Sequence, residues 1–134
     1  MQQTLSNQQL TDIAHEFGSP VYVYHAERIT EQYNKLKNAF SKSNARFFYA
    51  CKSLTNVNVL KHILSIGASL DCVSIHEVKL GLMAGFEPKN ILYTPNCVDF
   101  DEIVAAKDLG VNINIDNISI LEQFGTRFGN SYPV

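Results

Sequence analysis

The chain has 134 residues, of which 46% are hydrophobic and 18% are charged, and its formal net charge is −2. Length and composition are those of one ordinary globular domain, and they argue against an intrinsically disordered chain. The charge balance offers no basic surface for nucleic acid or a membrane, and no apolar run approaches the ~20 residues that a membrane-spanning helix requires.

Residues 1–42 predict a helix, a strand and a second helix. Ser6 and Gln9 have the spacing of a capping box, apolar residues then recur at helical spacing, and Gly18 ends the helix. The segment PVYVY, residues 20–24, has the composition of a strand. One apolar face defines the longer second helix: Ile29, Tyr33, Leu36 and Phe40. We take 1–42 as an N-terminal helix, strand and linking helix, and 43–134 as a separate barrel domain that continues beyond the chain end.

From residue 43 onward, strand-like and helix-like segments alternate with a period of roughly 20 residues. Strands are predicted at ARFFYAC, SLDCV, NILYT and VNINI, and each is followed by a helical apolar pattern. Several strands are continuous apolar runs, which is typical of parallel strands buried on both faces. Capping signals support the helices: Ser74 with Glu77, Asp99 with Glu102, and Asp116 or Asn117 at their beginnings, and Gly67, Gly85 and Gly110 at their ends.

This alternation predicts an α/β protein, either an open doubly wound sheet or part of a (β/α)8 barrel. No G-x-G-x-x-G motif follows any strand, so a dinucleotide-binding sheet lacks its main support. A closed barrel needs about 250 residues, whereas this chain offers four βα units and ends at YPV, which has the pattern of a further strand. We therefore expect the N-terminal part of a barrel, truncated after about four βα units.

Lys52 ends the apolar run FFYAC, where a barrel strand would deliver it to the rim that holds active sites in this fold. An apolar neighbourhood would favour the neutral amine, which can attack an aldehyde and form a Schiff base. The alternative is a lysine that extends past the strand end to solvent. The residues alone favour the alternative.

Three further polar residues lie at or after the ends of the next two predicted strands. Asp71 could share a rim with Lys52, because neighbouring strands lie about 4.8 Å apart, or it could bind local backbone amides as a turn residue, which the residues alone favour. Glu77 is explained by the Ser74 capping box, although the same helix N-terminus could also face the rim. Asn96 is interpreted as a turn residue.

The three cysteines, Cys51, Cys72 and Cys97, include no C-x-x-C pair, and the N-terminus lacks the pattern of a secretion signal. We therefore expect a reducing, cytoplasmic location without a disulfide framework. Because the cysteine spacing is simply the βα period, we reject a metal cluster and predict no metal site. The four histidines are scattered and form no i, i+4 ligand pair.

An ordered set of motifs resembles a known family. YA-x-K, then G-x-x-x-D-x-x-S-x-x-E, AGF-x-P-x-x-I and N-x-D-N resemble the N-terminal part of the fold-type III decarboxylases that depend on pyridoxal 5'-phosphate (PLP), and most of all their diaminopimelate-specific branch. The resemblance extends from about Phe17 to the end of the chain. It implies a PLP-binding barrel whose N-terminal strand, 20–24, belongs to a second, β-rich domain outside this chain.

The resemblance also implies roles for residues. Lys52 would anchor PLP as a Schiff base, Asp71 would lie beside it at the cofactor, and Glu77 would support the same pocket. The substrate would be meso-2,6-diaminoheptanedioate, the products L-lysine and carbon dioxide, and the full-length protein a homodimer. The phosphate loop, the partner of the pyridine nitrogen and the substrate contacts would lie beyond Val134, so we expect the fragment alone to be inactive.

The sequence differs from the family pattern at two positions beside Lys52, and three other classes of protein are alternatives to the main interpretation. Cys51 and Leu54 stand where the family more often has valine and asparagine, and Leu54 lacks the asparagine's hydrogen bond at the rim. A sister decarboxylase acting on ornithine, arginine or carboxynorspermidine would share these motifs. A non-catalytic binding protein is disfavoured because Lys52 and Asp71 are both present, and a small PLP carrier of the racemase-like barrel type would lack GSPVYVYHAERI.

Overall fold

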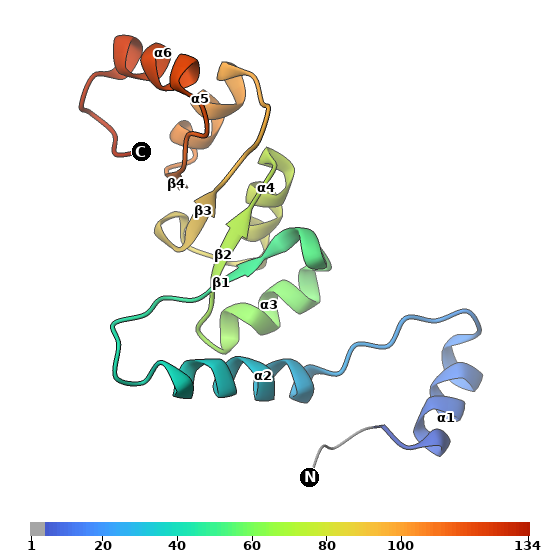
Figure 1. The fold of residues 1–134 in the computed structure, drawn as a ribbon. Coiled ribbons are helices and arrows are strands. Elements are labelled where there is room, and N and C mark those ends of the chain that lie inside the picture. The colour runs from blue at the N-terminus through green and yellow to red at the C-terminus, as the bar shows by residue number, and fades with distance from the viewer. Residues whose placement is uncertain (1–4) are drawn as a thin grey trace. The chain divides into compact units, whose positions relative to one another are not determined.

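The computed structural model describes residues 5–134. The chain divides into two compact units, the first ending at Ala39 and the second running from Phe40 to Val134 (Figure 1). The candidate site lies entirely in the second unit.

The first unit contains helices α1 (Asn7–Phe17) and α2 (Ala26–Ala39). The predicted capping box is confirmed, since the Ser6 hydroxyl accepts from Gln9 N–H at 3.2 Å and the Gln9 side chain accepts from Ser6 N–H at 2.8 Å. The strand predicted at 20–24 is wrong for this structure, because the segment is irregular. A strand exists only when its N–H and C=O groups pair with another strand, and within residues 5–134 none pairs with this segment.

The second unit is built on four parallel strands: β1 (Phe48–Ala50), β2 (Ser69–Cys72), β3 (Ile91–Tyr93) and β4 (Asn112–Ile113). Each lies inside a segment predicted to be a strand. The intervening helices are α3 (Val57–Ser65), α4 (Ile75–Ala84) and α5 (Phe100–Asp108), and α6 (Ile118–Phe128) follows β4. The strand predicted at YPV does not form. Among residues 5–134, no helix is long and apolar enough to cross a membrane.

The order of the strands decides between the two predicted architectures. The strands pair as β1-β2-β3-β4, in the order in which they follow each other along the chain (Figure 1). Right-handed crossovers in such an order place every connecting helix on the same face of the sheet. A doubly wound sheet instead reverses its strand order at a switch point. The structure therefore confirms a segment of barrel wall, and the doubly wound alternative is wrong.

The hydrophobic core lies between the strands and these helices. Leu70 of β2 and Ile91 of β3 are neighbours in register and are fully buried. Both lie against Gly81 of α4, where a Cβ atom would come within 2.5 Å of Leu70 Cδ2 and 3.2 Å of Ile91 Cδ1. The absence of a side chain at this position therefore lets α4 approach the sheet closely.

Residues that alternate with this core lie on the other face of the strands. In register they are Ala50, Asp71, Leu92 and Asn112. All four are half-buried or exposed, in contrast to the fully buried residues of the helix-covered face. Asp71 is the one ionisable side chain in this row.

The N-terminal ends of the strands are tied together by Arg46. Its guanidinium donates to Ser69 Oγ at 3.0 Å, to the Lys89 carbonyl at 2.8 Å and to Asn90 Oδ1 at 2.7 Å. The Asn112 side chain donates to the same Lys89 carbonyl at 2.9 Å. These bonds connect the beginnings of all four strands at the edge opposite the candidate site.

Candidate active site

The candidate site lies at the carboxyl ends of β1, β2 and β3. In (β/α) barrels this edge carries the loops that hold catalytic groups. Three polar residues reach it from consecutive strands: Lys52 in the turn that follows β1, Asp71 within β2, and Thr94 directly after β3. The register pairs Ala50 with Asp71, so Asp71 lies beside the strand that Lys52 follows.

Lys52 is the central residue of a 3-10 turn, η1 (Cys51–Ser53), that continues β1. The turn is closed by Leu54 N–H, which donates to the Cys51 carbonyl at 3.1 Å. The Tyr49 hydroxyl donates to the Leu54 carbonyl at 3.3 Å and joins the strand to the turn. The backbone that holds Lys52 is therefore fixed on both sides.

The expected apolar surroundings of Lys52 are wrong, because the side chain is exposed. The preceding apolar run belongs to the strand, and the chain turns out of the sheet at Cys51 before the lysine is reached. No ion pair within residues 5–134 involves Lys52. The amine is thus accessible to a small molecule that approaches the strand ends.

Asp71 is half-buried and lies one residue before the end of β2. Its Oδ1 accepts a hydrogen bond of 2.6 Å from the Thr94 hydroxyl. The interpretation of Asp71 as a turn residue that binds local amides is wrong, because its partner comes from the next strand. Thr94 was missed by the sequence analysis, although a hydroxyl residue at the end of NILYT, one strand along from Asp71, was a usable signal.

Glu77 lies in the first turn of α4 and is buried, with 9% of its surface exposed. Ser74 caps the helix as predicted, since its hydroxyl accepts from Glu77 N–H at 3.2 Å. The reciprocal half of the capping box is shifted by one residue, because Glu77 Oε2 accepts from Val73 N–H at 2.8 Å rather than from the N-cap itself. Glu77 therefore secures the turn that follows Asp71 and Cys72.

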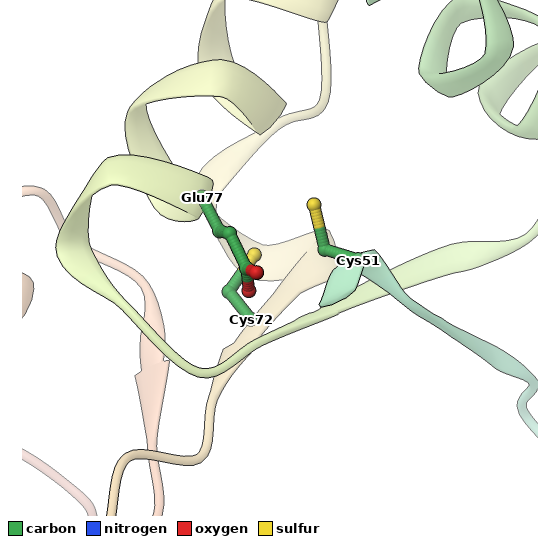
Figure 2. A group of neighbouring side chains, drawn as sticks. All are labelled: Cys51, Cys72 and Glu77. Carbon is green, nitrogen blue, oxygen red and sulfur yellow. The ribbon is translucent and has the colours of Figure 1, made fainter. Parts of the chain in front are cut away.

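Figure 2 shows Glu77 reaching from α4 toward Cys72 and Cys51 at the ends of two strands. The ligand-type atoms of these three side chains lie within 4.8 Å of one another, and both cysteines are fully buried. Cys97 is exposed and lies outside this group, with its thiol donating to Asn96 Oδ1 at 3.2 Å. No histidine or aspartate joins the three among the described residues.

Burial, followed by the nearby Glu77 charge, raises the pKa of the Cys51 thiol to about 11. Burial and the neighbouring Cys51 raise the pKa of Cys72 as well. Both thiols are therefore protonated near neutral pH and act as small apolar side chains. A metal ion would have to displace the protons of both thiols and bind three anionic ligands in a buried place. That no metal binds here therefore remains a prediction, and this chemical argument supports it.

Comparison with known proteins identifies relatives across most of the chain. Residues 26–131 match the family described as the pyridoxal-binding domain of pyridoxal-dependent decarboxylases. The diaminopimelate decarboxylase of Methanothermobacter thermautotrophicus is 46% identical over 112 residues, which cover 82% of this chain and 26% of that protein. The diaminopimelate decarboxylase of Escherichia coli K12 is 30% identical over 125 residues, covering 90% and 29%.

Solved structures share the fold. A lysine/ornithine decarboxylase from Vibrio vulnificus, complexed with putrescine, superposes with a TM-score of 0.83 at 29% identity over 93% of this chain and 35% of its own. A diaminopimelate decarboxylase from M. jannaschii, in complex with L-lysine, gives a TM-score of 0.78 at 25% identity over 90% and 30%. The chain thus spans about a quarter to a third of the relatives that it matches.

Proposed function

This chain belongs to the family of pyridoxal-binding domains of pyridoxal-dependent decarboxylases, and on that premise we propose that it binds PLP at the carboxyl ends of β1 to β3, with Lys52 as the covalent anchor. The observation that supports this most is the place of Lys52. It stands on a fixed turn at the end of the first barrel strand, exposed to solvent. An aldehyde cofactor needs a reachable amine of this kind.

The residues beside Lys52 fit the proposed cofactor. Asp71 presents a carboxylate from the adjacent strand, held by a hydrogen bond to Thr94. Glu77 holds the turn after β2 through Val73 N–H. We therefore assign Asp71 to the cofactor face beside Lys52, and Glu77 to the support of the same pocket from behind the strand.

For the reaction we propose the decarboxylation of meso-2,6-diaminoheptanedioate to L-lysine and carbon dioxide, in lysine biosynthesis. When bound, PLP supplies an electron sink for the pair of electrons released as carbon dioxide leaves. The residues of this chain hold the cofactor by the Lys52 amine and orient it through Asp71. The names of the relatives from M. thermautotrophicus and E. coli support this substrate. We propose a cytoplasmic homodimer as the working form.

Borohydride reduction tests the assignment of Lys52. The intact protein that the gene encodes is incubated with PLP, reduced, digested and mapped by mass spectrometry. We expect the pyridoxyl group on the peptide that contains Lys52, and we expect Lys52→Arg to lower it to background because arginine keeps the charge but forms no such linkage. Lys61→Arg, which changes an exposed lysine of α3, is the matched control. A pyridoxyl group on another lysine would contradict the assignment.

The second candidate is a sister decarboxylase, which the likeness to the lysine/ornithine decarboxylase favours. The two candidates are separated by measuring carbon dioxide release from meso-2,6-diaminoheptanedioate, ornithine, arginine, lysine and carboxynorspermidine. We expect kcat/KM for the first substrate to exceed the others at least about a hundredfold, since a site built for a second carboxylate leaves buried polar groups unpaired with substrates that lack it. Preferred release from ornithine or lysine would instead establish the sister activity.

A further inference from the structure

The hydrogen bond between Thr94 and Asp71 joins two strand ends at the proposed cofactor site. Its length of 2.6 Å is that of a hydroxyl bound to a charged oxygen, which is among the stronger kinds of hydrogen bond in proteins. Within residues 5–134, the Asp71 carboxylate accepts this hydrogen bond from the Thr94 hydroxyl. Asp71 is paired in register with Leu92, two residues before Thr94, so the bond runs diagonally across the strand pair.

The Thr94 hydroxyl is itself held in place. The backbone N–H of Thr94 donates to the Cys72 carbonyl at 2.8 Å, which extends the β2–β3 ladder past the end of β3. The hydroxyl also lies 3.5 Å from the same carbonyl oxygen. Threonine is branched at Cβ and therefore has few side-chain rotamers. The Thr94 hydroxyl is thus restrained by contacts other than its hydrogen bond to Asp71.

On the side of Asp71 away from Thr94, the neighbouring strand presents a small residue. Its register neighbour on β1 is Ala50, whose side chain is a single methyl group, and Lys52 follows two residues later. Asp71 thus belongs to the row of residues on the face opposite the helix-covered core, with its carboxylate bound to Thr94 on the β3 side and a methyl group in register on the β1 side.

We propose that Thr94 is a positioning residue for PLP: it fixes the Asp71 carboxylate in the orientation in which that group contacts the cofactor held by Lys52. The proposal rests on the proposed function. The competing explanation is that the bond is only a tie between β2 and β3, which would contribute to folding and leave the affinity for PLP unchanged.

A double-mutant cycle distinguishes these explanations. Thr94→Val replaces the hydroxyl with a methyl group of similar size, Thr94→Ser keeps the hydroxyl, and Asp71→Asn removes the charge that it binds. The measured quantity is the Kd for PLP in the intact protein, followed by absorbance, with circular dichroism as the check that each variant is folded. We expect Thr94→Val to weaken PLP binding about tenfold and Thr94→Ser to restore it to within about twofold of the wild type.

Thr94→Val should have no further effect on Kd in the Asp71→Asn background, because the two residues act as one unit. The proposal is overturned if Thr94→Val leaves Kd unchanged while PLP still binds Lys52, or if its effect persists without the Asp71 charge. If the wild type carries no PLP on Lys52, the proposed function fails, and the assignment of Thr94 fails with it.

Discussion

Cys51 and Lys52 are consecutive in the chain and have opposite surroundings. The Cys51 thiol is fully buried against Cys72 and Glu77, whereas the Lys52 side chain is exposed. The change occurs because the strand gives way to a 3-10 turn at Cys51. At the scale of one residue, the turn therefore separates a thiol that is buried behind the strands from an amine that is exposed at their ends.

This burial predicts a dependence of stability on pH. The pKa of Cys51 is raised from 9.0 to about 11 in the folded chain, so between these values the unfolded state loses a proton that the folded state keeps. The resulting stabilisation is present below pH 9 and is lost as the pH rises toward 11, by roughly 2–3 kcal/mol in all. Cys51→Val should remove this component.

The check is the free energy of unfolding in urea, measured from about pH 7 to about pH 11. The difference between wild type and Cys51→Val should change by roughly 2–3 kcal/mol in favour of the variant over this range. Cys97→Ser, which alters an exposed thiol, is the control and should follow the wild type. Parallel curves for wild type and Cys51→Val would show that the thiol does not titrate differently on unfolding.

The same scale shows what the sequence could predict of the site. The position of Lys52 followed from an apolar run that ends in a charge, and the expected proximity of Asp71 to the β1 strand followed from strand spacing alone. The place of Thr94 at the end of the next strand was a signal for its proximity to Asp71, but the hydrogen bond itself depends on how β2 and β3 are aligned, since a shift by one residue would turn the side chain to the other face. The family motifs supplied the chemistry that these patterns could not.

At the scale of elements, local signals predicted helix boundaries better than they predicted strands. Ser6, Ser74 and Asn117 each accept a backbone N–H at the start of a helix as expected. Asp99 occupies the N-cap position of α5 without making a side-chain hydrogen bond, and Glu102 binds the Tyr93 hydroxyl instead. Such competition between local and distant partners is invisible in the sequence.

Replacing glycine with alanine should have opposite effects on stability at two helix positions, Gly81 in α4 and Gly125 in α6. The difference arises because only Gly81 lies against the sheet. Gly81→Ala would place a methyl group 2.5 Å from Leu70 Cδ2 in a fully buried layer. We expect a net loss of about 1–2 kcal/mol, because the cost of overpacking exceeds the gain in helix propensity. Gly125→Ala in α6 meets no atom within 4 Å and should gain about 0.5–1 kcal/mol.

Urea denaturation of both variants measures these changes directly, and a common m-value would show that the unfolded state is unaffected. The pair is matched, because both changes add one methyl group to a helix interior. A Gly81→Ala variant as stable as the wild type would contradict this prediction, because it would mean either that Leu70 and Ile91 can move aside or that α4 does not approach the sheet so closely.

At the scale of the second unit, the architecture rests on a single property, namely strands that pair in chain order. The periodicity of roughly 20 residues predicted parallel βα units, but periodicity does not determine strand order, so the barrel and the doubly wound sheet both remained candidates. The strand predicted at 20–24 illustrates the same limit of local patterns. Its apolar residues have the composition of a strand, but composition does not indicate which strand it would pair with.

The hydrogen bonds of Arg46 bear on which parts of the second unit can change in sequence without disturbing the sheet. Arg46 and Asn112 join the beginnings of the strands, at the edge opposite Lys52, Asp71 and Thr94. The beginnings of the strands are thus aligned by contacts that do not involve the loops after the strands. Substitutions in the loops after the strands would therefore leave the alignment of the strand beginnings intact, so this half of the unit can stay constant while the loops diverge.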